Sequence, residues 1–240
     1  MWDTIEKHPL IRETREKLRE KRTLLVEGLW DSPKALLALL TAKARDHNVL
    51  VITSGEGEMR LLDDLAYFSD RPVFAFPPWE TLPGEKIAPS PDTVGKRLRI
   101  LHALEKERRV ILLAPLQAVL QKVPGKDPLR RRVLNWHKGE SVPFDSLATL
   151  LTERGYRREH VAVDKGEFAI RGGILDIFSL SAPAPYRIEF FDDEITSMRT
   201  YDPASQRSVK KEEHLLIVPA NETEAIEGDG GGVDTTRPSG

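Results

Sequence analysis

The sequence predicts a two-part α/β fold, in which a parallel α/β domain is followed by a mostly antiparallel α+β domain. In the first half, short apolar runs alternate with helical patterns, which is typical of βα units that feed a parallel sheet. In the second half, strand-like runs follow one another with turn residues between them, which favours an antiparallel sheet. The length of 240 residues allows one or two domains with a proper hydrophobic core.

The first half is expected to contain buried strands at residues 23–27, 48–53, 73–76 and 110–114. Helical patterns separate these strands at residues 32–45, 57–68 and 92–107. The first helix has the clearest start signal, because Ser32 can serve as its N-cap and Pro33 can take the first helical position. These elements predict a small layered α/β domain.

The second half is expected to contain a helix at 144–154 and strands at 156–163, 167–171, 174–178, 186–191, 195–201 and 214–218. Clusters of Gly, Pro and Asp separate the strands. The last residues are acidic and then Gly-rich, a composition that cannot bury enough apolar surface to become ordered. We therefore expect an α/β domain at 1–130, an α+β domain at 131–219 and a flexible tail at 220–240.

Composition excludes several classes of function. The chain has 36 Lys and Arg against 38 Asp and Glu, and this near-neutral balance argues against a protein that binds nucleic acid mainly through charge. The absence of cysteine excludes a disulfide scaffold, a Cys-ligated zinc site and thiol catalysis. Residues 1–20 are charged throughout, unlike a signal peptide, and the apolar runs are far shorter than the ~20 residues that span a bilayer. We expect a cytoplasmic protein.

The first strand-to-helix turn, at residues 27–35, is where a phosphate-binding loop would lie. Such a loop needs a glycine directly before its lysine, and a Ser or Thr after it to hold magnesium. Pro33 and Ala35 stand at those two positions, while Trp30 and Asp31 would crowd and repel a phosphate. We expect no nucleotide there; the alternative is an atypical anion site at the helix N-terminus.

Other catalytic or metal-binding patterns are weak. The six histidines include no pair four residues apart around a Glu, and the chain has no Gly-x-Ser-x-Gly elbow. His160 and His214 lie beside strands and are expected to be structural. The acidic residues 192–194 could hold a metal, but between two strands they are better explained as a turn. We expect no catalytic, cofactor-binding or metal-binding residue.

Two further segments have structural explanations. Arg130, Arg131 and Arg132 could touch a phosphate backbone, yet three adjacent arginines point in different directions on any regular element. A solvated linker is the simpler explanation. In the proline-rich segment 77–83, Trp79 and Leu82 are expected to anchor a loop into the core.

One expected strand carries an unusual outward face. Alternate side chains of a strand point to opposite faces, so Ile188 and Phe190 would pack on the core. Arg187, Glu189 and Phe191 would then face water. Mixed arginine and aromatic residues are typical of binding hot spots. Alternatively, Phe191 closes the hairpin against its own loop, and the charges form an ordinary solvated face.

The strand at 167–171 has the same alternation. Phe168 and Ile170 are expected to face the core, while Glu167, Ala169 and Arg171 are expected to face outward. If the two strands are neighbours, their outward residues form one exposed patch. The candidate residues of that patch are Arg171, Arg187, Glu189 and Phe191.

Four segments together match a known pattern. They are FPPWETLP at 76–83, GKRLRIL at 95–101, GEFAIRGGILDIF at 166–178 and YRIEFFDDEITSMRTYDPASQRS at 186–208. They resemble the N-terminal module of the bacterial transcription-repair coupling factors, the Mfd family, which is itself similar to the damage-verification protein UvrB. The resemblance extends over residues 23–221.

The resemblance implies a degenerate P-loop, helicase-like α/β domain and an α+β domain that docks onto the repair protein UvrA. In this family the α/β domain lacks a functional nucleotide site, which agrees with Pro33 and Ala35, whereas UvrB keeps its P-loop. The family contacts UvrA through arginines and an aromatic residue on the exposed strand face. By motif these positions fall on Arg171, Arg187 and Phe191, with Glu189 as a weaker addition.

The resemblance also implies what this chain does not do. The family continues into an RNA-polymerase-binding domain and a DNA translocase motor with its own ATP site, and neither is expected here. We therefore expect a UvrA-recruiting module without enzymatic activity or cofactor. The alternatives are an ATP-dependent damage-recognition protein of the UvrB type, and direct DNA binding through Arg130, Arg131 and Arg132.

Overall fold

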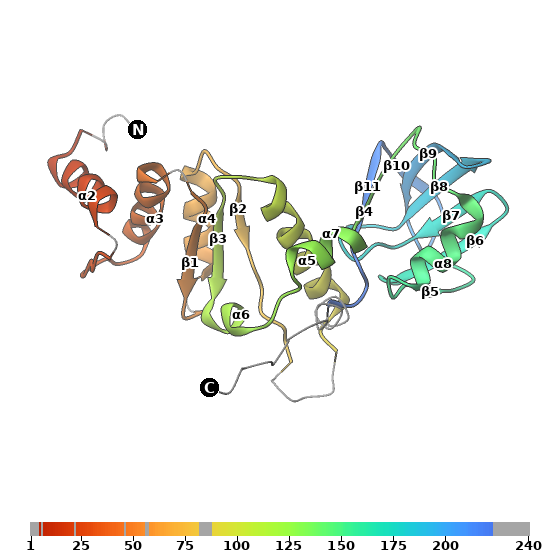
Figure 1. Cartoon of the computed structure of the whole chain (residues 1–240), viewed down its shortest axis with the longest axis horizontal. Helices are drawn as coiled ribbons and strands as arrows, with labels where there is room; N and C mark the ends of the chain where they lie inside the picture. Colours follow the sequence, from red (N-terminus) through yellow and green to blue (C-terminus); the bar gives the residue numbers. More distant parts are fainter. Residues whose placement is uncertain are drawn as a thin grey trace, which may run out of the picture. The chain divides into compact units, whose positions relative to one another are not determined.

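The computed structural model describes residues 5, 7–21, 23–45, 47–55, 58–81 and 88–222. The chain divides into two compact units (Figure 1). The first consists of Met1–Pro78 and Ala103–Gln121, and the second of Trp79–His102 and Lys122–Gly240. The fold is mixed α/β with parallel and antiparallel sheets. The expected domain boundaries stay predictions, and residues 223–240 of the expected tail lie outside the described residues.

The first unit contains a three-stranded parallel sheet. Its strands are β1 (Val49–Thr53), β2 (Val73–Ala75) and β3 (Ile111–Pro115), in the order β1-β3-β2. The helices of this unit are α2 (Pro9–Glu20), α3 (Ser32–Ala44), α4 (Glu58–Phe68) and α6 (Leu116–Leu120). The core forms where α3 and α4 contribute Leu39 and Leu65 against Ile111 and Leu113 of β3. The predicted parallel arrangement is therefore confirmed for three strands.

The strand expected at residues 23–27 is wrong. The structure has no strand there, and within the described residues no other strand pairs with this segment. Leu25 is 81% exposed. A run of β-formers becomes a strand only where a neighbour accepts its backbone hydrogen bonds and its side chains find a surface to pack on.

The second unit is built around a six-stranded sheet of order β10-β9-β8-β7-β6-β5. Its strands are β5 (Arg157–Arg158), β6 (Glu167–Arg171), β7 (Ile174–Ile177), β8 (Tyr186–Phe191), β9 (Glu194–Tyr201) and β10 (Ser208–Glu212). All neighbouring pairs are antiparallel except β5 and β6. A separate antiparallel pair joins β4 (Leu134–His137) to β11 (His214–Ile217). The predicted antiparallel character of the second half is confirmed.

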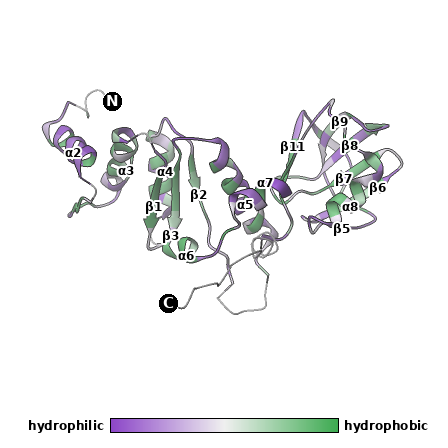
Figure 2. Ribbon diagram, viewed as in Figure 1, coloured by the Kyte–Doolittle hydropathy of each residue, from purple (hydrophilic) through white to green (hydrophobic). Residues whose placement is uncertain are grey.

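Helices complete this unit around a single large core. They are α5 (Pro91–Lys106, of which residues up to His102 belong here), α7 (Lys126–Arg132), the 3-10 turn η1 (Phe144–Ser146) and α8 (Leu147–Thr152). The core includes Leu98 of α5, Trp136 of β4, and Phe168, Leu175 and Ile188 of the sheet. Strands of the six-stranded sheet carry both hydrophilic and hydrophobic colours, whereas β1 and β3 are mainly hydrophobic (Figure 2).

Gly95 sets the packing of α5. A side-chain carbon at this position would collide with the carbonyl oxygen of Leu180. Glycine is therefore required for the close approach of the helix to this backbone segment. The start of the helix is tied to the same region, because Lys165 Nζ donates to Asp92 Oδ1 at 2.6 Å and to the Leu180 carbonyl at 3.2 Å.

A buried ion pair joins α5 to the end of the described chain. Arg97 Nε lies 2.9 Å from Glu222 Oε2, and their side chains are 0% and 1% exposed. Trp79 Nε1 donates to the same oxygen at 2.8 Å, and the Arg97 guanidinium lies 5.0 Å from the centroid of its ring. Trp79 is thus an anchor as predicted. Leu82, its expected companion, lies outside the described residues.

Several local expectations need correction. The linker expected around residues 130–132 is helical, because these arginines form the last turn of α7. Helix formation is explained by Pro128 and Leu129, which are buried and anchor the segment. The strand expected at 156–163 is only two residues long, β5, because the chain turns away after Arg158. The strands β4 and β10 were not predicted. No helix of the described residues is long and apolar enough to cross a membrane.

Candidate protein-interaction surface

The four candidate residues lie on the side of the six-stranded sheet that faces away from the core, here called the outer face. Along β8, Ile188 is fully buried and Phe190 packs against the core cluster, so the alternate residues point outward. This is the expected alternation. The register places Arg187 opposite Asp176 of β7, and Glu189 opposite Ile174.

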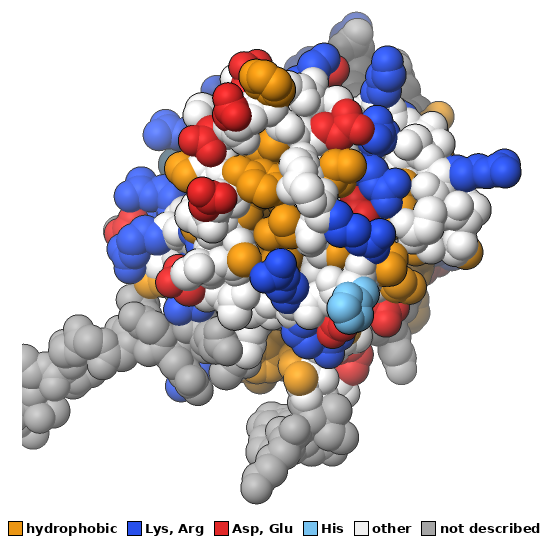
Figure 3. Space-filling model, turned by 90° about the vertical axis from the view of Figure 1, so that its right-hand side faces the viewer, with side chains coloured by type: hydrophobic (Ala, Val, Ile, Leu, Met, Phe, Trp, Pro, Cys, Tyr) orange, Lys and Arg blue, Asp and Glu red, His pale blue; other side chains and the backbone are white. Residues whose placement is uncertain are grey.

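The same register places Arg171 in line with Glu189, on the other side of β7. Arg171 pairs with Ile174, which in turn pairs with Glu189, so the three side chains form one row across three strands. Strand spacing of about 4.8 Å places Arg171 roughly 10 Å from Glu189. The two strands were expected to be neighbours, but β7 lies between β6 and β8; the four candidate residues still lie on one face of the sheet, and their joint role stays a prediction. Acidic and basic side chains are interspersed with hydrophobic ones on this end of the second unit (Figure 3).

Arg187 is held in a single geometry. Its Nε donates to Asp176 Oδ1 at 2.7 Å and its Nη2 to Asp176 Oδ2 at 2.8 Å, a bidentate pair. The guanidinium also lies 4.7 Å from the centroid of the Tyr201 ring. The hydrogen bond with Asp176 raises the pKa of Arg187, and the side chain is only 19% exposed. Arg187 is therefore held in one position, and its side chain is less exposed than the strand pattern predicts.

Asp176 and Tyr201 were missed as parts of this site. The Asp176 side chain is 6% exposed, and Tyr201 is fully buried with its hydroxyl donating to the Ala162 carbonyl at 2.7 Å. Burial raises the pKa of Tyr201. The available signal was Asp176 itself, a lone carboxylate in the apolar run ILDIF, since a buried acid needs a cationic partner.

Glu189 is also paired. Its carboxylate accepts a hydrogen bond from Ser197 Oγ at 2.7 Å and forms an ion pair with Arg199. The hydrogen bond from Ser197 and the charge of Arg199 lower the pKa of Glu189. Glu189 and Arg199 thus form a neutral pair that orders the middle of the outer face.

Phe191 is the exposed apolar residue of the patch. It is the last residue of β8 and is 73% exposed, which contradicts the alternative that it closes the hairpin against its own loop. The following turn, Asp192–Asp193, leads directly into β9, as predicted for the acidic segment. Asp193 fixes the turn, because its Oδ1 accepts from the Phe144 amide at 2.9 Å and its carbonyl from the Val142 amide at 2.8 Å. Phe191 therefore projects from a well-tethered hairpin.

The water-facing position expected for Glu167 and Ala169 is wrong. Glu167 is 8% exposed and Ala169 is 2% exposed. The chain after β5 folds back over them, and Glu167 Oε2 accepts from the amides of Val163 and Asp164 at 3.1 and 2.9 Å. Arg171 at the end of β6 stays exposed and donates to the His160 carbonyl.

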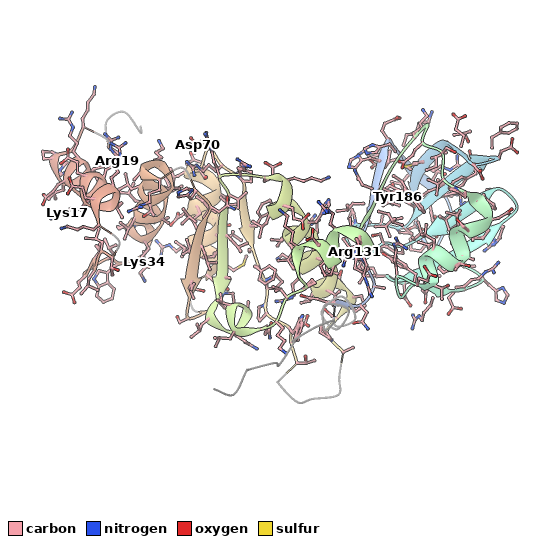
Figure 4. All side chains as sticks on the ribbon, in the orientation of Figure 1. Lys17, Arg19, Lys34, Asp70, Arg131 and Tyr186 are labelled. Carbon is pink, nitrogen blue, oxygen red and sulfur yellow. The ribbon has the colours of Figure 1, made fainter. Side chains whose placement is uncertain are left out.

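The first unit has a cavity where a phosphate-binding loop would lie. It measures about 410 Å³ and its lining includes Asp31, Lys34, Arg60 and Asp64. Asp31 takes the N-cap position of α3, one residue before the expected Ser32, and pairs with Arg60 at 3.5 Å. Lys34 lies in the first turn of the helix (Figure 4). Two carboxylates therefore line the cavity together with two cationic side chains, and their charges offset one another.

The remaining candidates have local structural roles. Arg130 forms an exposed ion pair with Asp127 at 3.3 Å within α7. His214 stacks on His137 across the β4–β11 pair, with ring centroids 6.1 Å apart. Among the described residues no three His, Asp or Glu side chains form a group that could hold a metal ion.

Comparison with known proteins finds a family match within the second unit. Residues 134–222 match the family model of the UvrB interaction domain. They include β4 to β11 and therefore the whole outer face.

Longer matches extend the similarity over most of the chain. The chain is 36% identical over 174 residues, 72% of its length, to the transcription-repair-coupling factor of Escherichia coli. It is 39% identical over 195 residues, 76% of its length, to that of Mycobacterium bovis, and 31% identical over 209 residues, 86% of its length, to that of Bacillus subtilis. These matches confirm the resemblance seen in the motifs. The chain spans 15%, 16% and 18% of these three relatives.

Proposed function

We propose that this chain recruits UvrA within a transcription-repair coupling factor, and that the outer face of its UvrB interaction domain is the docking surface. The observation that carries the proposal is the ordered patch of Arg171, Arg187, Glu189 and Phe191 on one sheet face. Aromatic and arginine residues are enriched among interface hot spots. The surface is also pre-organised, because Arg187 and Glu189 are already fixed by Asp176 and Arg199. Pre-organisation lowers the entropic cost of binding.

Phe191 offers the cleanest test of this surface. Its side chain makes no contribution to the core at 73% exposure, so Phe191→Ala should leave the fold intact. Truncating a hot-spot residue typically costs at least ~2 kcal/mol, so we expect UvrA to bind this variant about thirtyfold more weakly. Val209→Ala is the matched control, because Val209 is 71% exposed on the edge strand β10. Calorimetry that gives equal UvrA affinity for the wild type and Phe191→Ala would overturn the proposal.

Arg187 needs a different design. Arg187→Ala alone would leave the Asp176 carboxylate buried without its partner, at a cost of about 3 kcal/mol in folding free energy. A loss of binding in this variant could not be distinguished from a loss of folding. The double variant Arg187→Gln with Asp176→Asn removes both charges and keeps polar groups that can hydrogen-bond. We expect a folded protein with weakened UvrA binding. Circular dichroism checks the fold before the affinity is compared.

We further propose that the first unit does not hydrolyse nucleotide. Pro33 and Ala35 remove the glycine and the hydroxyl of a P-loop, and the carboxylates of Asp31 and Asp64 offset the charges of Lys34 and Arg60 in the cavity. Titration with ATP and magnesium should give no heat of binding. Micromolar affinity, or DNA-stimulated phosphate release, would support the UvrB-type alternative instead. Contacts with RNA polymerase and DNA belong, in this proposal, to other domains of the family, and the protein works in the cytoplasm.

A further inference from the structure

Two histidines face each other on the separate strand pair of the second unit. The register of β4 and β11 places His137 directly opposite His214 (Figure 1). The next pair along the ladder is hydrogen-bonded, because the Lys138 amide donates to the Glu213 carbonyl at 3.0 Å. The two histidines therefore occupy a non-hydrogen-bonded position, where opposite side chains come closest and their Cβ atoms are about 5 Å apart.

The backbone that carries this histidine pair is fixed by the core. Trp136 and Leu215, which are opposite each other one step along the ladder, are 3% and 2% exposed. Because side chains alternate along a strand, the adjacent histidines point to the other face, and both are exposed to solvent. The end of β4 is tied down as well, since Glu140 Oε2 accepts a hydrogen bond from the His137 amide at 2.9 Å. The two rings are thus presented together from an ordered ladder.

The rings lie close together and have ring nitrogens to spare. Their centroids are 6.1 Å apart and their planes are inclined by 26°. His137 Nε2 lies 3.0 Å from Asn135 Nδ2, a contact that orients the ring. Within the described residues, Nδ1 of His137 and both ring nitrogens of His214 make no hydrogen bond. Stacking explains the nearly parallel rings, but it uses none of these nitrogens.

Paired imidazoles on one exposed face have a specific chemistry. Neutral imidazole nitrogen is a ligand for borderline divalent ions such as Zn²⁺, Ni²⁺ and Cu²⁺, whereas Mg²⁺ and Ca²⁺ prefer oxygen. The neighbouring charges do not repel a cation, because Lys138 Nζ lies 3.7 Å from Glu213 Oε1 and the two charges offset each other. Two ligands held opposite each other on a ladder also lose little freedom when both bind one ion.

We propose that His137 and His214 form a binding site for one divalent transition-metal ion, which joins β4 to β11. Each histidine supplies one nitrogen, and water completes the coordination. With two protein ligands, the site is open and exchangeable, unlike a structural centre with four. The ion would stabilise the end of the unit, because β11 leads to Glu222 and its buried ion pair with Arg97. This site uses no residue of the outer face, so it is independent of the proposed function.

Zinc titration of the full chain, prepared without a histidine tag, tests the site. Zinc chloride should shift the backbone NMR signals of residues 135–138 and 213–215 and raise the midpoint of thermal unfolding. Even an outer-shell partner of a metal-binding histidine typically contributes about 10–100-fold in metal affinity. Loss of a ligand in His137→Gln or in His214→Gln should therefore weaken zinc binding at least about tenfold. Both side chains are exposed, so the variants should fold.

The matched control is His160→Gln, which removes another exposed histidine of the same unit. It should bind zinc as tightly as the wild type. The proposal is overturned if the wild type shows no zinc-dependent shift at these two segments. Equal zinc affinity of the wild type and the two ligand variants would overturn it as well.

A comparison of metal ions identifies the ligand type. Imidazole ligation predicts that Cu²⁺ binds more tightly than Zn²⁺ and that Mg²⁺ causes no shift at the same signals. Magnesium shifts of equal size would assign the binding to carboxylates such as Glu140 and would contradict the histidine site.

Discussion

The three-stranded and the six-stranded sheets of this protein differ in how their faces are covered. In the three-stranded parallel sheet, Leu50 and Ile52 of β1 are 50% and 51% exposed. In the six-stranded sheet, Leu175 and Ile188 are fully buried and the outer face is ordered by ion pairs. Parallel sheets are normally covered on both faces, whereas an antiparallel sheet can present one face to water. The exposed face of the six-stranded sheet is therefore ordered by ion pairs, whereas β1 of the three-stranded sheet leaves apolar side chains exposed.

The buried ion pair of the second unit should give the largest effect. Glu222→Gln removes the carboxylate that pairs with the fully buried Arg97 guanidinium, which should cost about 4 kcal/mol. Urea unfolding followed by tryptophan fluorescence reports it directly, because Trp79 contacts both residues. The control is Glu13→Gln, which breaks the exposed pair of Glu13 with Lys17 in the first unit and should change nothing measurable. Similar losses in both variants would remove the contrast between the units.

Paired leucine truncations test the contrast between the sheets. Leu175→Ala creates a cavity in a fully buried site and should cost about 3 kcal/mol. Leu50→Ala removes a half-exposed side chain from β1 and should cost less than about 1 kcal/mol. Chemical denaturation of the two variants gives both numbers. A large loss for Leu50→Ala would mean that β1 is covered in solution.

Gly95→Ala tests how closely α5 packs within the second unit. The added carbon collides with the Leu180 carbonyl, so the helix must move, at a cost of about 2 kcal/mol. Lys96→Ala is the control, because Lys96 is exposed on the same helix. Thermal unfolding should show a lower midpoint for Gly95→Ala alone. An unchanged midpoint would show that α5 can shift freely.

Glu80 should give the smallest effect, and one that depends on pH. Partial burial acts to raise the pKa of Glu80, but hydrogen bonds from Thr93 and Ser90 outweigh it and lower the pKa to about 2, from an ordinary value of 4.5. A depressed pKa stabilises the folded state above the unfolded pKa, and this contribution is lost as the pH falls toward 2. The difference in urea midpoint between the wild type and Glu80→Gln should therefore shrink between pH 5 and pH 2.5. A difference independent of pH would contradict this assignment.

The sequence predicted side-chain orientation correctly where residues close together in the chain decide it. Strand alternation placed Ile188 inward and Phe191 outward, because side chains of a strand have a fixed period of two. It failed where a distant segment decides the outcome. Glu167 and Ala169 were expected to face water, but the chain between β5 and β6 covers them. The run at 23–27 has strand composition but lacks a pairing neighbour among the described residues.

The sequence by itself determined the mixed α/β character, the antiparallel second half and the family resemblance, and it proposed four candidate residues whose role stays a prediction. These follow from periodicity and motifs, which depend only on residues close together in the chain. Only the tertiary structure decided that Asp176 and Tyr201 hold Arg187, and that Arg199 pairs with Glu189. Strand register and burial create these contacts. Both depend on residues far apart in the chain, and for that reason no local pattern could reveal them.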